Sequence, residues 1–205
     1  WARVQNNLGG AYANLPRGDR GENLSRAILC HEYALRVFTE TDFPQDWARA
    51  QNNLGNAYAN LPRGDRGENL ARAIEHFKNA LRVFTETGYP QDWARAENNL
   101  GNAYAEIPSG RRSENLARAI ECYNNALRVR TELDFPEEWA GTENNLGNAY
   151  VNLSSGDRGE NLSLAITRFE NALRVYTETA YPNEHRRVTR NLARAREELA
   201  VLRSK

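Results

Sequence analysis

The chain has 205 residues, in which 27 lysines and arginines balance 27 aspartates and glutamates, so the formal net charge is zero. This balance argues against a general nucleic-acid-binding protein or a surface for anionic membranes, because both need an excess of basic residues. The sequence has no apolar run of the ~20 residues that a membrane-spanning helix needs, and no signal peptide is visible.

One stretch of sequence recurs at a fixed spacing. The segment WARAQNNLGNAYANLP at 47–62 has near copies that begin at Trp1, Trp93 and Trp139, and a degenerate fifth copy begins at His185, each copy 46 residues after the last. Such periodicity indicates an array of stacked repeats rather than a single globular core. The sequence therefore predicts one repeat domain over 1–205, with repeats at 1–46, 47–92, 93–138 and 139–184 and a closing helix at 185–205.

Each repeat begins with a predicted helix, which the second copy illustrates. Pro44 suits the first turn of a helix, where its missing N–H costs nothing, and Asp46 favours the positive end of the helix dipole. Apolar residues then recur at three- and four-residue spacing, at Trp47, Ala50, Leu54, Ala57, Tyr58 and Leu61. This spacing predicts an amphipathic helix over about 45–61.

A polar loop, PRGDRGE in the second copy, separates the first helix from a second one. Three of the four second helices start with the Asp-x-x-Glu spacing of a capping box, at Asp19/Glu22, Asp65/Glu68 and Asp157/Glu160. Arg111 replaces the aspartate in the third copy, so we expect that helix start to be less well capped. Apolar residues at helical spacing predict a second helix over about 67–86, at Leu70, Ala73, Ile74, Phe77, Leu81 and Phe84. Arg82 and Glu86, spaced i,i+4, are expected to support this helix.

Two helices in each unit, short loops and the lack of any strand pattern predict an all-α fold. We expect an α-solenoid of four helix-turn-helix repeats, closed at the carboxyl end by the polar helix 185–205. The amino-terminal repeat has no such cap, so its exposed first helix is a candidate surface for end-to-end self-association.

The residues that fill each unit resemble a known pattern. Leu54, Gly55 and Tyr58, followed by Ala73, Phe77, Ala80 and Pro90, match L-G-x-x-Y…A…F…A…P, and in this the chain resembles the tetratricopeptide repeat (TPR) family over nearly its whole length. The unit is longer than the usual ~34 residues. It is more similar to the extended repeats of kinesin light chains and of bacterial, often cyanobacterial, arrays joined to CHAT protease domains. The resemblance implies a right-handed superhelix.

The resemblance also assigns a ligand-binding surface, because first helices line a concave groove in TPR arrays. Its groove positions fall here on Arg49, Asn52, Asn53, Asn56, Asn60, Arg95, Asn98, Asn99, Asn102, Asn144, Asn145 and Asn148. A carboxamide both donates and accepts hydrogen bonds, so a row of asparagines suits the backbone of an extended peptide. The arginines would favour acidic side chains or a C-terminal carboxylate. We therefore expect a scaffold that binds a protein or peptide ligand.

Alternatives to peptide binding remain open. The row of Asn7, Asn53, Asn99 and Asn145 can instead tie neighbouring helices together, and repeat duplication copies every residue whether or not it is used. The array can also be a structural spacer or a self-assembling rod. A third alternative, taken from the resemblance, is the regulatory arm of a CHAT-type protease.

No constellation of residues predicts catalysis, a cofactor or a metal site. His31, His76 and His185 share no register with a serine, cysteine or carboxylate that would complete a catalytic group. Cys30 and Cys122 lie two repeats apart, beyond disulfide reach if neighbouring helices step by roughly 8–10 Å. Unpaired cysteines indicate reducing surroundings and a cytoplasmic location. We expect no enzymatic activity.

Overall fold

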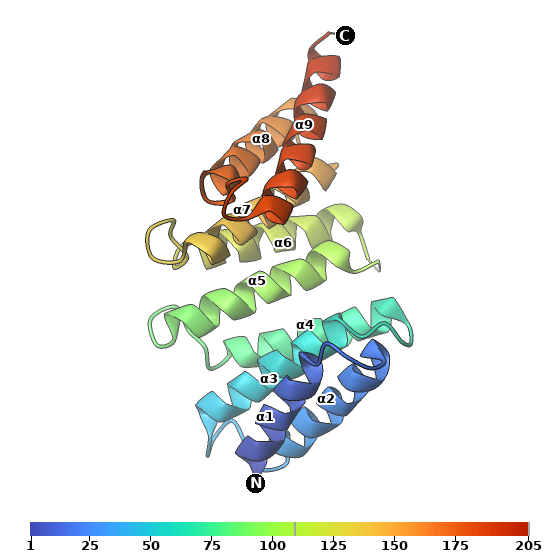
Figure 1. Ribbon diagram of the computed structural model, residues 1–205, viewed down its shortest axis with the longest axis vertical. Helices are drawn as coiled ribbons and strands as arrows, with labels where there is room; N and C mark the ends of the chain where they lie inside the picture. The colour runs from blue at the N-terminus through green and yellow to red at the C-terminus, as the bar shows by residue number, and fades with distance from the viewer. Residues whose placement is uncertain (109, 205) are drawn as a thin grey trace. The chain divides into compact units, whose positions relative to one another are not determined.

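The structure is a computed structural model, which describes residues 1–108 and 110–204. Within these residues the chain is all-helical, with nine α-helices and no strand, so the predicted fold class is confirmed (Figure 1). The helices are α1 (Ala2–Ala13), α2 (Arg20–Leu35), α3 (Pro44–Ala59), α4 (Arg66–Leu81), α5 (Pro90–Glu106), α6 (Arg112–Leu127), α7 (Pro136–Asn152), α8 (Arg158–Val175) and α9 (Pro182–Arg203).

The helices divide into two compact units, one holding α1 to α5 and the other α6 to α9. In each unit every helix packs against the next one in the chain, so α1 and α2, α3 and α4, and α7 and α8 form hairpins. Helix α1 also contacts α3, α3 contacts α5, and α7 contacts α9. The first helices of successive repeats are therefore neighbours within a unit.

The first helix of the second repeat packs closely on its partner because of a glycine. Helix α3 begins at Pro44 and ends at Ala59, near the predicted bounds. A Cβ added to Gly55 would lie 2.7 Å from Cε1 of Phe77, a side chain of α4 that is fully buried. Phe77 thus occupies the space that any larger residue at position 55 would need, and the two helices approach more closely than bulkier residues allow.

The second helices begin at aspartate caps, as predicted. Asp19, Asp65 and Asp157 each accept a hydrogen bond from the backbone N–H three residues later, at 2.7 to 2.8 Å. Arg111 makes no side-chain cap at the start of α6, which confirms the expected weakness there. The preceding loop is closed by a buried asparagine: Asn69 Nδ2 donates to the carbonyl of Arg63 at 2.7 Å, around Gly64 with its positive φ of 78°.

The second helix is shorter than predicted, because α4 ends at Leu81 rather than near 86. Phe84 lies beyond the end of the helix, yet it is buried and contacts Tyr89 edge-on at 5.7 Å between ring centroids. Outside the helix, Arg82 and Glu86 are not one helical turn apart, so the predicted i,i+4 support is wrong. Arg82 instead pairs with Glu40 of the preceding repeat at 2.8 Å. Arg174 likewise pairs with Glu132 at 2.7 Å.

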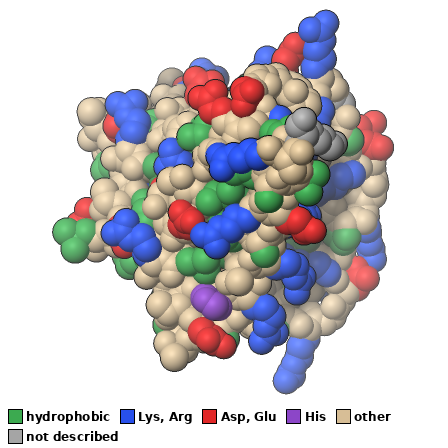
Figure 2. All heavy atoms as spheres, turned by 90° about the horizontal axis from the view of Figure 1, so that it is seen from above, with side chains coloured by type: hydrophobic (Ala, Val, Ile, Leu, Met, Phe, Trp, Pro, Cys, Tyr) green, Lys and Arg blue, Asp and Glu red, His purple; other side chains and the backbone are tan. Residues whose placement is uncertain are grey.

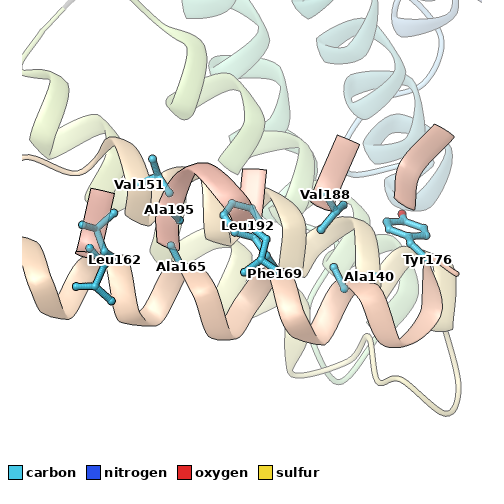
Figure 3. Packing of buried hydrophobic residues seen from close by; sticks show 11 residues of the cluster. Ala140, Val151, Leu162, Ala165, Phe169, Tyr176, Val188, Leu192 and Ala195 are labelled. Atoms are coloured by element: carbon cyan, nitrogen blue, oxygen red, sulfur yellow. The ribbon is translucent and has the colours of Figure 1, made fainter. Parts of the chain in front are cut away.

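The closing helix α9 covers the interior of the second unit. It starts at Pro182, slightly earlier than predicted, and buries Val188, Leu192, Ala195 and Leu199. These side chains share one apolar cluster with Phe169 and other residues of α7 and α8 (Figure 3). The opposite face of α9 carries exposed arginines, which fits the expected polar cap.

Candidate functional site

The predicted groove residues lie on the first helices, but their exposure differs. Arg49, Arg95 and Asn60 are exposed, whereas Asn52 and Asn144 are only 2% and 4% exposed. The others are half-buried: Asn53, Asn56, Asn98, Asn99, Asn102, Asn145 and Asn148. The two buried asparagines have their side chains in the interior and are not at a surface that a peptide touches.

One set of asparagines links neighbouring first helices. Each bond joins side-chain amides 47 residues apart: Asn53 Nδ2 donates to Asn6 Oδ1 at 3.4 Å, Asn99 to Asn52 at 3.3 Å, and Asn191 to Asn144 at 3.4 Å. Asn53 and Asn99 therefore tie neighbouring helices together, as the structural alternative for this row predicts. The bonds are long, and so each contributes at the weak end of the range for neutral pairs.

A second set of asparagines closes the ends of first helices. Asn60 Nδ2 donates to the carbonyl of Asn56 at 2.8 Å, and Asn14 and Asn152 make the same bond to the residue four positions earlier. Asn60 Oδ1 has no partner among the described residues. The side chain of Asn56 makes no hydrogen bond to the described residues either. These two residues keep amide groups available to a ligand.

Two hollows open between neighbouring first helices of the first unit. The larger, of about 260 Å³, lies between α1, α2 and α3, and its lining includes Arg20, His31 and Asn53. The smaller, of about 110 Å³, lies between α3, α4 and α5, and its lining includes Arg66 and Glu106. Asn56 and Asn60 line both hollows, which therefore sit on either side of α3.

The arginine row that was expected to attract ligand carboxylates already has acidic partners. Arg3 lies 3.2 Å from Asp46, and Arg49 lies 3.9 Å from Asp92, the aspartate in the first turn of the following first helix. Arg95 also pairs with Asp92. These exposed pairs are weak, but they reduce the positive field that the row presents to a ligand.

The arginine at the start of each second helix was missed by sequence reasoning. Arg20 and Arg66 reach back to donate to the carbonyls of Ala13 and Ala59, the last residues of α1 and α3. Both arginines therefore lie in the hollows described above. Their recurrence in the segment DRGE is the only sequence signal, and that segment indicates a helix start rather than a ligand site.

Buried polar pairs join the two helices of a repeat, at positions 25 residues apart. His31 Nδ1 lies 3.0 Å from Asn6 Oδ1, and burial lowers the pKa of His31 to about 4. His76 Nδ1 lies 2.7 Å from Gln51 Oε1, and burial lowers its pKa too. In the second unit Arg168 contacts Glu143 at 3.2 Å, where burial raises the pKa of the carboxyl group despite the arginine. Each pair lies between the two helices of one hairpin, and His31 also lines the larger hollow.

The described residues hold no group of three or more side chains placed to bind a metal ion. None of the described helices is both long and apolar enough to cross a membrane. Cys30 and Cys122 are buried, and no disulfide joins them. Figure 2 shows basic and acidic side chains interspersed over the face seen from above. No protein-family model matches the chain, and no curated protein matches it.

Proposed function

We propose that this protein is a TPR-type interaction module, which binds an extended segment of another protein across its first helices. The observation that supports it most is the pair of adjoining hollows that share Asn56 and Asn60. The lack of a disulfide between Cys30 and Cys122 supports a reducing, cytoplasmic setting for such a module.

The dimensions of the hollows suit a peptide backbone. Packed helices lie roughly 8–10 Å apart, and an extended chain rises about 3.3 Å per residue. A peptide that crosses α1, α3 and α5 would therefore advance about three residues from one hollow to the next. Amide side chains such as Asn56 can donate to its carbonyls and accept from its N–H groups, which gives binding with tolerance for sequence.

The test separates binding asparagines from structural ones. A double variant, Asn56→Ala with Asn60→Ala, is measured with wild type for capture of a random pool of ten-residue peptides with blocked ends. We expect at least about tenfold weaker capture, from the loss of two hydrogen-bonding groups, with a nearly unchanged thermal melt. Asn124→Ala, on an exposed part of α6, is the matched control and should behave as wild type.

Two results bear on the alternatives. Asn52→Ala should lower the melting temperature, because Asn52 is buried and accepts from Asn99. Equal capture of the peptide pool by wild type and by the double variant would contradict the proposal.

A second candidate function is end-to-end association of two copies through the first repeat. Val4 and Leu8 on α1 are 65% and 40% exposed, and Trp1 directly before the helix is 68% exposed, so an apolar face is uncovered. The equivalent positions in the second repeat, Ala50 and Leu54, are buried. Sedimentation equilibrium of wild type beside Val4→Lys tests this function. A monomer at high concentration for both would exclude it.

A further inference from the structure

We propose that Arg20 binds a carboxylate group of the ligand in the larger hollow. This inference rests on the proposed function but names the chemistry of one subsite. Arg20, Arg66 and Arg158 occupy the same position in three repeats of this chain, and their partners differ.

In two repeats this arginine holds a carboxylate. Arg158 donates to the carbonyl of Val151 at 2.6 Å, and its Nε and a terminal nitrogen both donate to Glu198 Oε1, at 2.8 and 2.6 Å. Arg66 makes the equivalent bond to Ala59 and pairs with Glu106. In both cases the carboxylate lies 40 residues after the arginine, at the last residue of α5 for Glu106 and within α9 for Glu198.

In the first repeat the carboxylate is missing. The residue 40 positions after Arg20 is Asn60, and Asn60 does not bond to it. Arg20 donates to the carbonyl of Ala13 and has no acidic partner among the described residues. No acidic residue lines the larger hollow, whereas Glu106 lines the smaller one. The larger hollow also has more than twice the volume of the smaller, at about 260 against 110 Å³.

The hollow therefore offers the donors that a carboxylate needs. A guanidinium group has five N–H donors, and the bond to Ala13 uses one terminal nitrogen, which leaves the Nε edge and the other nitrogen that Arg158 uses for Glu198. The side-chain amide of Asn56 lines the same hollow and can donate to the second carboxylate oxygen. A carboxylate at this place would reproduce a contact that the fold already makes twice.

Substitutions at the residue 40 positions after each arginine, Asn60 after Arg20 and Glu106 after Arg66, test the assignment. Asn60→Glu supplies an internal carboxylate to Arg20, and Glu106→Asn removes the one beside Arg66. The fold accommodates either residue at this position, since Asn60 and Glu106 both stand at the end of a first helix. Thermal melts of both variants check this directly.

The first probe is propionate, with propionamide as its uncharged control. The Nε–H resonance of Arg20 is followed by nuclear magnetic resonance during the titration, with that of Arg66 as an internal reference. We expect a saturable shift at Arg20 in wild type, none in Asn60→Glu, and a new one at Arg66 in Glu106→Asn. No saturable shift at Arg20 in wild type, or the same shift in Asn60→Glu, overturns the inference.

The second probe distinguishes the source of the carboxylate. Peptide pools with blocked ends carry either Glu or Gln at the centre, and a third pool carries Gln and a free C-terminus. We expect wild type to prefer the Glu pool or the free C-terminus about fivefold, as for a partly exposed charge pair, and Asn60→Glu to lose this preference. Peptides that bind without any preference for a carboxylate overturn the inference. If propionate binds at Arg20 but no pool is captured, the proposed function fails while the carboxylate subsite stands.

Discussion

Replacing His31 by phenylalanine should remove a large part of the acid sensitivity of the first repeat. His31 is 1% exposed between α1 and α2, and its equivalents in the other repeats are Phe77, Tyr123 and Phe169. Phenylalanine should therefore fit the site. Asn6 Oδ1, which accepts from the imidazole, would keep its bond from Asn53 Nδ2 at 3.4 Å.

The sign and size of the effect follow from the pKa of His31. Burial lowers it from 6.5 to about 4, so the unfolded chain binds a proton at a higher pH than the folded protein does. The folded state therefore loses stability as the pH falls from about 6.5 to about 4. At ~1.36 kcal/mol per pH unit, the full loss is on the order of 3 kcal/mol. Solvent does not screen this energy appreciably, because the ring of His31 is almost fully buried.

Urea denaturation at pH 7.5, 6, 5 and 4 measures this loss. The free energy of unfolding of wild type should fall more steeply than that of His31→Phe, and the gap between them should widen by about 2–3 kcal/mol over this range. His76 and the carboxyl groups titrate in both proteins, so their contributions cancel in the difference. A gap that stays within about 0.5 kcal/mol across the range would refute the reasoning, because the extrapolation error is of that order.

Three further substitutions test the packing and the caps. Arg168→Leu should destabilise the second unit by about 3–5 kcal/mol, because it leaves Glu143, 3% exposed, without its charge partner; adding Glu143→Gln should recover much of the loss in the same urea assay. Gly55→Ala should lower the free energy of unfolding by about 1–3 kcal/mol, because it overpacks the space that Phe77 fills. Its control is Gly10→Ala, where an added Cβ meets nothing within 4 Å, and which should leave the free energy of unfolding equal or slightly higher. Arg111→Asp should raise stability by about 1 kcal/mol by creating the missing cap; a thermal melt no higher than that of Arg111→Ala would contradict this.

The fold was predictable from the sequence because each local signal agreed with the next. Proline at the first helical turn, aspartate caps and the glycine at position 55 each act within one hairpin, and the fixed period copies them along the chain. The end of the second helix was not predictable, because Phe84 continues the apolar spacing but packs against Tyr89 from beyond the helix end. Tertiary packing overrode the periodicity there.

The candidate site was predictable only in outline. The recurring asparagines marked the first helices, but recurrence does not distinguish Asn52, which is buried, from Asn56, which lines two hollows. The distinction depends on which side of the helix faces the neighbouring repeat. The role of Arg20 was not predictable, because its lack of an acidic partner emerges only beside the contacts of Arg66.

The buried pairs inside the hairpins restrict how repeats of this kind can be exchanged. Gln51 pairs with His76 and Glu143 with Arg168, so the same two positions carry a neutral pair in one repeat and a charged pair in another. A recombination junction between the two positions would place Glu143 opposite histidine, or Gln51 opposite arginine, in the interior. A junction in the linker before a first helix would transfer both partners together. Lineages that gain or lose repeats should therefore do so by whole hairpins, with breakpoints outside this 25-residue interval.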